Sequence, residues 1–158
     1  IEGRMKTALY VATVARTYRK AIDDYMESEE KYRANMEYYK REIAKCTYRQ
    51  FTTGFYFGKT DSESQIYDSN TYVKNYTYIG TVREVTPDGC VCFEQKNKFL
   101  VGEKLEAMGF DGTNIECEVQ AIYDEEGNSM DSAPHPKQKL RVKLDKELET
   151  GIILRRKE

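Results

Sequence analysis

The feature that most constrains this fold is a change of hydrophobic periodicity near residue 46. Between Gly3 and Gly54 the chain contains neither glycine nor proline, the two residues that most often interrupt a helix. Apolar side chains in this stretch recur every three or four residues, as they do on one face of a helix. Farther along, apolar positions alternate in short runs separated by turn residues, which is typical of strands. The sequence therefore predicts an α+β fold in which helices precede a sheet.

Two apolar stripes predict a helical hairpin over roughly residues 6–46. The short polar segment 27–29 joins the two, and charged residues on the opposite face of the first have the pattern of a solvated surface. The first stripe comprises Val11, Val14, Ala15, Tyr18, Ile22 and Tyr25, and the second comprises Tyr32, Met36, Tyr39 and Ile43.

The region 72–158 predicts a small antiparallel β-barrel. About six short β-type runs with tight turns favour a closed or nearly closed sheet, and closure would protect the strand edges. Residues 87–89 and 111–112 are turn signals of the Pro-Asp-Gly and Asp-Gly type. The side chains expected to point inward are Val82, Val91 or Cys92, Phe93, Ile115, Cys117, Val119, Val142 and Ile153.

Residues 47–71 are expected to form an aromatic segment followed by a linker. The stretch 51–58 is aromatic and β-favouring, with two glycines. The stretch 59–70 is rich in Ser, Asp, Thr and Lys, and Ile66 is its one aliphatic residue. We therefore predict a domain boundary here, between a helical segment at 1–46 and a barrel at 72–158.

The composition limits the classes of protein to which this chain can belong. Its formal net charge is −2, whereas dedicated nucleic-acid-binding domains usually carry a clear basic excess. No apolar stretch approaches the roughly 20 residues that span a bilayer, and the first residues do not resemble a secretory signal. We expect a cytoplasmic protein without membrane contact, in which the four cysteines stay reduced.

Five segments, in order, resemble the U32 peptidase family, the collagenase-like peptidases. The segments are IEGRMK with YVATVARTYRKAID at 10–23, YRQFTTGFYFGK at 48–59, NKFLVGEKLE at 97–106, APHPKQ at 133–138 and GIILRR at 151–156. The second and third match R-x-x-T-T-G-F and N-x-F-x-x-G-(D/E)-x-L-E. The matching positions are Arg49, Thr52, Thr53, Gly54 and Phe55, then Asn97, Phe99, Gly102 and Glu106, with His135 in the fourth segment.

The resemblance implies a larger parent protein, in which a TIM-type catalytic barrel precedes this region. The residues 1–4 would end the last strand of that barrel, and the first helix here would be its last helix. The family's cysteine- and glycine-containing signature is absent, and catalytic groups of such barrels come from several strand ends. We therefore expect no catalytic residue and no cofactor in this fragment. Some members resemble proteins that hydroxylate tRNA or ribosomal RNA, so the parent's chemistry stays open between protease and RNA modification.

The opening IEGR has two interpretations. It matches the recognition sequence of a protease used to remove expression tags, but the family resemblance also explains the residues that follow, and we favour native sequence. Arg4 and Lys6 could then bind an anionic substrate at the barrel mouth. The alternative is that both are solvated.

Cysteine and histidine chemistry is weakly supported. Cys90 and Cys92 lie two residues apart, but zinc would need two further ligands, so we predict structural cysteines and no metal. His135, held between two prolines, is expected to be a loop residue rather than a catalyst. Without a cysteine–histidine pair, the fragment alone should have no peptidase activity.

The basic residues of the β region are the candidate substrate contacts. They are Lys96, Lys98, Lys104, Lys137, Lys139 and Arg141. Together they could contact substrate phosphates, whereas the plain alternative is a lysine-rich solvent face that discourages strand-edge aggregation.

Three functions compete. The leading hypothesis is an accessory substrate-recognition region that assists RNA modification and whose partners are the parent's catalytic barrel and an RNA or peptide substrate. The alternatives are a genuine protease domain acting on protein or collagen, and a structural docking or dimerisation module.

Overall fold

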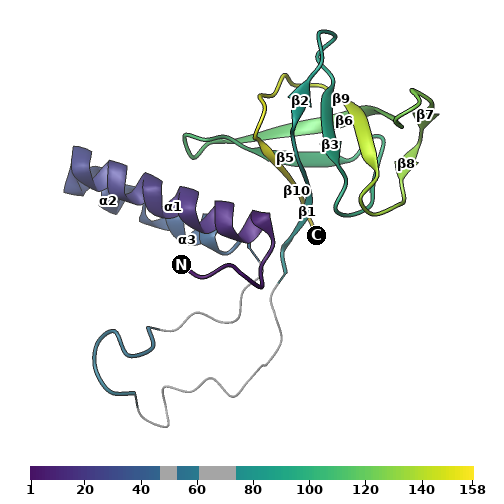
Figure 1. Cartoon of the computed structure of the whole chain (residues 1–158). Helices are drawn as coiled ribbons and strands as arrows, with labels where there is room; N and C mark the ends of the chain where they lie inside the picture. The colour runs from purple at the N-terminus through teal and green to yellow at the C-terminus, as the bar shows by residue number, and fades with distance from the viewer. Residues whose placement is uncertain (47–52, 61–73) are drawn as a thin grey trace.

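The computed structural model describes residues 1–46, 53–60 and 74–158 of the chain. Three helices come first: α1 (Ala8–Glu27), α2 (Glu29–Ala34) and α3 (Met36–Ile43). In Figure 1, α2 and α3 run back alongside α1, so the expected helical hairpin is present, with its second arm divided at Asn35. None of the helices in the described residues is long and apolar enough to span a membrane.

The turn between α1 and α2 is built from Ser28. Its backbone N–H donates to the carbonyl oxygen of Asp24 at 3.0 Å, which closes α1. Its hydroxyl oxygen accepts from the backbone N–H of Lys31 at 3.1 Å, which caps α2. Asp24 is itself buried and accepts the Tyr39 hydroxyl at 2.6 Å, so the same turn connects α1 to α3.

All pairings between the described strands are antiparallel. Most of the strands form one sheet of order β1-β10-β5-β6-β9-β3-β2, in which β7 also pairs with β6. A second, two-stranded sheet consists of β4 and β8. The strands are β1 (Tyr76–Thr81), β2 (Glu84–Val85), β3 (Val91–Glu94), β4 (Phe99–Leu100), β5 (Lys104–Met108), β6 (Asn114–Tyr123), β7 (Ser129–Met130), β8 (Ser132–Ala133), β9 (Lys139–Leu144) and β10 (Ile153–Lys157).

The two ends of this path, β1 and β2, are consecutive in the chain, with only Val82 and Arg83 between them. The N–H of Val82 donates to the Ile152 carbonyl oxygen at 2.9 Å, and the N–H of Arg83 donates to the Cys92 carbonyl oxygen at 2.8 Å. The chain therefore changes its partner at this point, from the β10 side to β3. No ladder in the described residues joins β1 to β2, so the structure shows an antiparallel sheet and not the closed barrel that the sequence predicted.

The core of the sheet contains most of the side chains expected there. Val82, Val91, Phe93, Cys117, Val119 and Val142 are all buried. The prediction for Ile153 was wrong, because the core instead takes up its two neighbours, Ile152 just before β10 and Leu154 within it. The prediction for Ile115 was also wrong: it lies near the start of β6 and is 37% exposed.

Helix α1 buries a different face from the one that its apolar pattern marks. The buried residues of the helix are Leu9, Thr13, Val14, Thr17 and Asp24. The other predicted stripe residues, here called the α1 stripe, are Val11, Ala15, Tyr18, Ile22 and Tyr25, and all of them are exposed. The buried face tolerates polar residues because they are hydrogen-bonded, as when Thr17 donates to the Thr13 carbonyl oxygen at 2.7 Å.

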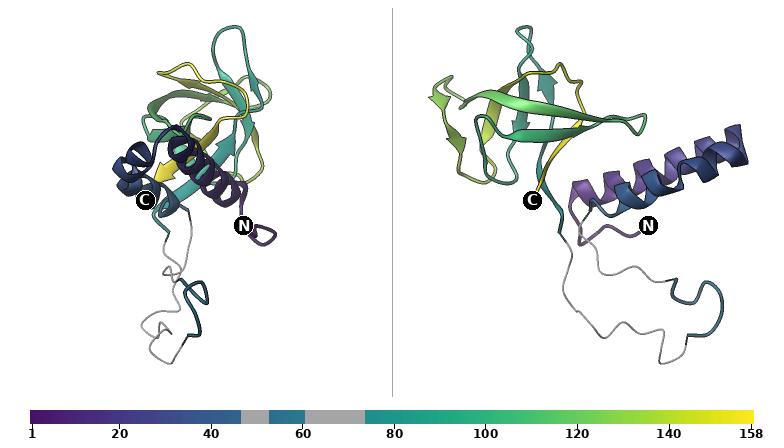
Figure 2. Two further views of the ribbon diagram at one scale, coloured as in Figure 1. Left: turned by 90° about the vertical axis from the view of Figure 1, so that its left-hand side faces the viewer. Right: turned by 180° about the vertical axis from the view of Figure 1, so that it is seen from behind.

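Only one half of the helical pair lies against the sheet. The β5–β6 hairpin reaches out over α1, and the far half of the helical pair projects away from the strands in the views of Figures 1 and 2. This arrangement leaves the α1 stripe without a covering element among the described residues.

The aromatic segment is described only over residues 53–60. There the chain forms turns, with the Tyr56 N–H donating to the Thr53 carbonyl oxygen at 3.1 Å, so the β-favouring composition does not produce a strand in this stretch. Gly54 has a φ of 52°, and Phe55 is exposed. Arg49, Thr52 and most of the predicted linker lie outside the described residues.

Candidate functional site

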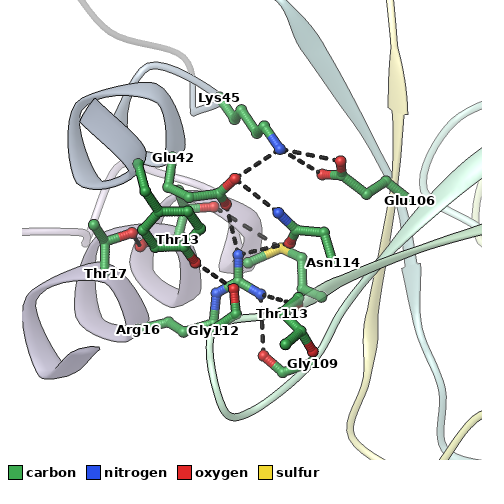
Figure 3. Close-up of polar contacts among 12 residues, drawn as sticks. Thr13, Arg16, Thr17, Glu42, Lys45, Glu106, Gly109, Gly112, Thr113 and Asn114 are labelled. Atoms are coloured by element: carbon green, nitrogen blue, oxygen red, sulfur yellow. Dashed lines mark hydrogen bonds and ion pairs between the residues drawn. The ribbon is translucent and has the colours of Figure 1, made fainter. Parts of the chain in front are cut away.

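A buried polar network joins the helices to the sheet (Figure 3). Its centre is Glu42 on α3, whose side chain is only 3% exposed. One carboxylate oxygen accepts from Arg16 at 2.6 Å and from Arg155 at 2.8 Å. The other accepts from Asn114 at 2.7 Å and pairs with Lys45 at 2.7 Å. Charge-assisted bonds of this kind fix geometry as well as energy.

Arg155 on β10 is fully buried and completes the network from the strand side. Its Nε donates to Glu106 on β5 at 2.7 Å, and its guanidinium lies 5.0 Å from the centre of the Tyr76 ring. Glu106 also accepts from Lys45 at 3.0 Å. Both carboxylates thus pair with Lys45 and Arg155, which leaves neither Arg155 nor Glu42 as an unpaired buried charge.

Arg16 on α1 holds the hairpin between β5 and β6. Its Nη1 donates to the carbonyl oxygens of Gly109 and Thr113, both at 3.0 Å, and its Nη2 also donates to Asn114 at 2.9 Å. The network of Arg16, Glu42, Lys45, Glu106, Asn114 and Arg155 is called here the helix–sheet network.

The network keeps Glu42 ionised. Burial alone would raise the pKa of this carboxyl, but hydrogen bonds and charge attraction from Lys45 and Arg155 outweigh it and lower the pKa to about 2. Asp24 is similar: burial raises its pKa, while hydrogen bonds from Tyr39, Lys20 and Asn35 hold it at about 2. These two groups hold the helices in a fixed orientation.

The predicted basic contacts lie on a different part of the sheet. Two grooves of about 400 and 420 Å³ run along β3 and β9 and share Cys92, Lys139 and Leu140 as lining residues. The first is also lined by Lys96, and the second by Arg141. They are called here the β3–β9 grooves.

The cations of these grooves are partly neutralised by neighbours. Lys96 forms an ion pair with Glu94, and Lys139 lies 3.9 Å from Glu125. The Arg141 guanidinium is 4.8 Å from the centre of the Tyr123 ring, and the residue is partly exposed. A further cation, Arg83, lines the first groove and was not among the predicted residues.

The other predicted basic residues do not line these grooves. Lys137, with a φ of 66°, precedes β9, and its N–H donates to the Gln95 carbonyl oxygen at 2.9 Å. Lys104 on β5 pairs with Glu116 at 3.0 Å. Lys98 lies in the β3–β4 turn, where its carbonyl oxygen accepts from Arg156.

The two predicted residues at the start of the chain lie beside α1. The N–H of Arg4 donates to Glu2 at 2.7 Å, and the Lys6 ammonium is 5.5 Å from the centre of the Tyr10 ring. The structure therefore brings Lys96, Lys139 and Arg141 together and keeps Arg4 and Lys6 with the helices.

Most residues of the family motif have structural roles. Asn97 donates to the Tyr78 carbonyl oxygen at 2.7 Å and so joins the β3–β4 turn to β1. Phe99 is fully buried and stacks on Phe93 with ring centres 5.9 Å apart. Gly102 has a φ of 83°, which favours glycine. Glu106 differs, because it belongs to the helix–sheet network.

The thiols are poor nucleophiles. Burial raises the pKa of Cys46, Cys90 and Cys92, and it raises the pKa of Cys117 to about 12. Cys90 also donates to the Asp88 carboxylate at 3.3 Å, which favours the protonated thiol further. Thiolates are the reactive form, so these cysteines lack the environment of a catalytic one.

His135 lies exposed in the loop before β9. Among the described residues, no three or more His, Cys, Asp or Glu side chains are grouped so that they could hold a metal ion.

The sequence analysis missed most of the helix–sheet network. Arg16 is one of the charged residues on the helix face whose pattern predicts a solvated surface, and no local pattern marks Glu42, Asn114 or Arg155 as site residues. One signal was available: Arg155 follows the apolar run 152–154 directly within a predicted strand, and a charge at such a position needs a buried partner.

Two family models match this chain, one over the helical part and one over the sheet. The family "Peptidase family U32" matches residues 1–66, and "Peptidase family U32 C-terminal domain" matches residues 74–155. The chain is 35% identical over 157 residues to tRNA hydroxylation protein P1 of Bacillus subtilis, which covers 99% of this chain and 37% of that protein. It is 30% identical over 155 residues to tRNA hydroxylation protein P of Escherichia coli, covering 98% of this chain and 33% of that one.

A solved C-terminal domain of a U32 peptidase-family protein from Geobacillus thermoleovorans is 30% identical, with a TM-score of 0.46, and covers 51% of this chain and 99% of that domain. The chain spans only 33% to 37% of the length of the two curated relatives above. The C-terminal domain match alone takes in more than half of the 158 residues, and it contains every strand described above apart from the last two residues of β10. The chain is a member of peptidase family U32 and carries the C-terminal domain of that family.

Proposed function

We propose that this chain is the substrate-recognition and docking region of a U32-family protein that takes part in tRNA hydroxylation. The observation that carries the proposal is its similarity, over nearly its whole length, to proteins named for tRNA hydroxylation. The sheet contacts RNA, the helices dock on the catalytic barrel of the longer protein, and that barrel supplies the chemistry. A cytoplasmic location goes with a tRNA substrate and with four free cysteines.

The β3–β9 grooves are the RNA-binding surface in this proposal. Arg83, Lys139 and Arg141 supply cations along them, and the Tyr123 ring lies beneath the Arg141 guanidinium. Cations that follow a groove next to aromatic rings suit a flexible nucleic-acid backbone. Five carboxylates line the same grooves and weaken the field of the four cations there, which suits a domain that assists binding rather than one that binds RNA tightly alone. They are Glu84, Glu94, Asp124, Glu125 and Glu126.

The α1 stripe is the docking surface for the catalytic barrel. Val11, Tyr18, Ile22 and Tyr25 are between 41% and 56% exposed and follow one another at spacings of three, four or seven residues. A contiguous apolar stripe of this kind marks an interaction surface. The helix–sheet network then holds the docked helices in a constant orientation to the RNA-binding grooves.

We propose further that the sheet is closed in effect, although no ladder joins β1 to β2 in the described residues. The segment 76–85 bonds to β10 through its first half and to β3 through its second, so chain continuity replaces the missing ladder. The Lys96 N–H also donates to the Ile79 carbonyl oxygen at 2.8 Å, which ties the end of β3 back to β1. Closure leaves β3 and β9 on a stiff outer surface.

Binding of labelled tRNA at several salt concentrations tests the proposal. We expect Lys139→Gln combined with Arg141→Gln to weaken binding and to flatten the slope of log affinity against log salt by about one unit per lost phosphate contact. Lys104→Gln is the control for the Lys139 change, because Lys104 is about as exposed as Lys139 but lines neither groove. The melting temperature should change little in all of these variants.

Three outcomes would contradict parts of the proposal. An absence of tRNA binding at low salt would leave docking as the domain's role. Equal losses in the control and the groove variant would remove the grooves as the binding surface. Cleavage of casein or gelatin by the chain would favour the protease alternative, against which the raised thiol pKa values argue.

A further inference from the structure

A cleft of about 630 Å³ lies between α1 and the end of the sheet, away from the β3–β9 grooves. Its size is within the roughly 300–1,000 Å³ that is usual for sites of small organic groups. The apolar part of its wall comes from both sides and consists of Ala12, Ala15, Met108, Phe110 and Ile153. It shares no lining residue with the β3–β9 grooves. It is called here the α1 cleft.

An exposed aromatic ring stands at this cleft. Phe110, at the tip of the β5–β6 hairpin, is 67% exposed, so packing does not account for it. The tip is held rigid because Asp111 accepts from the backbone N–H of Thr113 at 2.9 Å and from its hydroxyl at 2.7 Å. On the other side is Gly151, with a φ of 91°; a Cβ there would lie 3.0 Å from the Phe110 ring. The ring is therefore held in place and has a face available for stacking.

The wall of the cleft also contains a buried hydrogen-bond donor, Arg16 Nε, that has no acceptor in the described part of the chain. Arg16 lines the cleft, and its side chain is only 9% exposed. Both Nη atoms are used in the helix–sheet network, but Nε has no hydrogen-bond partner in the described part of the chain. A buried unpaired donor is costly, and a small shift of the Arg16 side chain toward the cleft would let an acceptor on a bound molecule satisfy it.

The charges around the cleft cancel. Four cationic side chains line it, namely Arg16, Arg19, Lys20 and Lys31, and four anionic ones, namely Asp23, Asp24, Glu27 and Asp111. Several pair with one another, as Lys20 does with Asp24 at 3.0 Å. A phosphate would meet as much repulsion as attraction here, whereas a neutral planar ring with an acceptor at its edge fits the wall and the donor together.

We propose that the α1 cleft binds one unpaired RNA base, which stacks on Phe110 and accepts a hydrogen bond from Arg16 Nε. Unstacked bases of single-stranded RNA are commonly held in this way, on an aromatic face with hydrogen bonds to the base edge. The inference rests on the RNA-binding role proposed above, and it adds a base contact at a site that shares no lining residue with the β3–β9 grooves.

The test uses the whole chain and a short single-stranded RNA that carries one 2-aminopurine. Binding should change the fluorescence of that base, and Phe110→Ala should weaken binding about tenfold, the loss expected for one base–aromatic stack. Phe110→Leu, which keeps an apolar side chain, should show a similar loss. Tyr25→Ala is the control, because its ring is exposed to a similar degree but lies outside the cleft.

An oligonucleotide with an abasic residue in place of the 2-aminopurine separates a base contact from a change in folding. Wild type and Phe110→Ala should bind it equally, since neither can stack on it. If Phe110→Ala binds the 2-aminopurine RNA as wild type does, the cleft is not a base site, while phosphate binding by the β3–β9 grooves can still hold. If wild type binds neither tRNA nor this RNA, both proposals fail.

Discussion

At the scale of single residues, the protein places its most consequential charges where no solvent reaches them. Arg155 is fully buried, and its stability in that position depends on the two carboxylates of Glu42 and Glu106. Replacing a buried ion pair by apolar residues can be neutral, but removing one partner leaves a charge that nothing balances. The contribution of each residue of this network to stability therefore depends on the others.

Glu42→Gln should destabilise the chain by about 3 kcal/mol, because Arg155, Arg16 and Lys45 lose their shared anion. Urea unfolding followed by circular dichroism measures the change. The matched control is Glu37→Gln, on the same helix but in an exposed pair with Lys40; it should change stability by about 0.5 kcal/mol or less. Equal effects of the two substitutions would mean that the network adds nothing specific.

The pH dependence of the same variant has a definite sign. The pKa of Glu42 is lowered from an ordinary value of 4.5 to about 2, so its stabilising effect is complete above pH 4.5 and is lost as pH falls toward 2. The stability gap between wild type and Glu42→Gln should therefore narrow over this window. A gap that stays constant from neutral pH down to pH 3 would contradict the assigned pKa.

At the scale of elements, β10 shows how register decides which side chains enter the core. It pairs with β1 on one side and β5 on the other, and Leu154 lies opposite Ala107. Ile152 and Leu154 are buried, whereas Ile153 between them faces the α1 cleft. A shift of one residue would exchange these faces.

Leu154→Ala should cost about 2–5 kcal/mol, because it removes a fully buried side chain from the core. Ile153→Ala, a deletion of similar size on the same strand, should cost clearly less, since that side chain is only partly buried. Thermal or urea unfolding of the two variants compares them directly. A larger loss for Ile153→Ala would show that β10 pairs in the other register.

At the scale of the whole molecule, the helices carry two faces with different tasks. One is joined to the sheet by the helix–sheet network, and the other, the α1 stripe, is apolar and exposed. Single exposed apolar residues are ordinary, but a stripe along about four helical turns is a surface that protein normally covers.

The chain by itself should therefore associate weakly through α1 as its concentration rises. Tyr18→Lys combined with Ile22→Lys should reduce this association without lowering the melting temperature, because both side chains are already about half exposed. Sedimentation equilibrium over a range of concentrations gives the measurement. Glu29→Lys, on the neighbouring α2, serves as a surface-charge control. A chain that is monomeric at every concentration would show that the stripe has little affinity for itself.

Several features could be predicted from local sequence. The change in hydrophobic periodicity predicted helices followed by antiparallel strands, and the motifs at 48–59 and 97–106 carried the resemblance to the U32 family that the comparisons confirm. Alternation along β3 and β9 also located Phe93 and Val142 in the core. These succeed because backbone preference and side-chain period are properties of neighbouring residues.

Tertiary structure alone decided the rest. Arg16, Glu42 and Arg155 lie on three elements up to 139 positions apart, so no local pattern brings them together. The same packing buries the more polar face of α1 and leaves its apolar face exposed. It also places the two halves of the segment 76–85 at the two ends of the sheet. The sequence by itself determined which helices and strands can form; only their packing determined which charges meet in the interior, because that depends on partners supplied from distant parts of the chain.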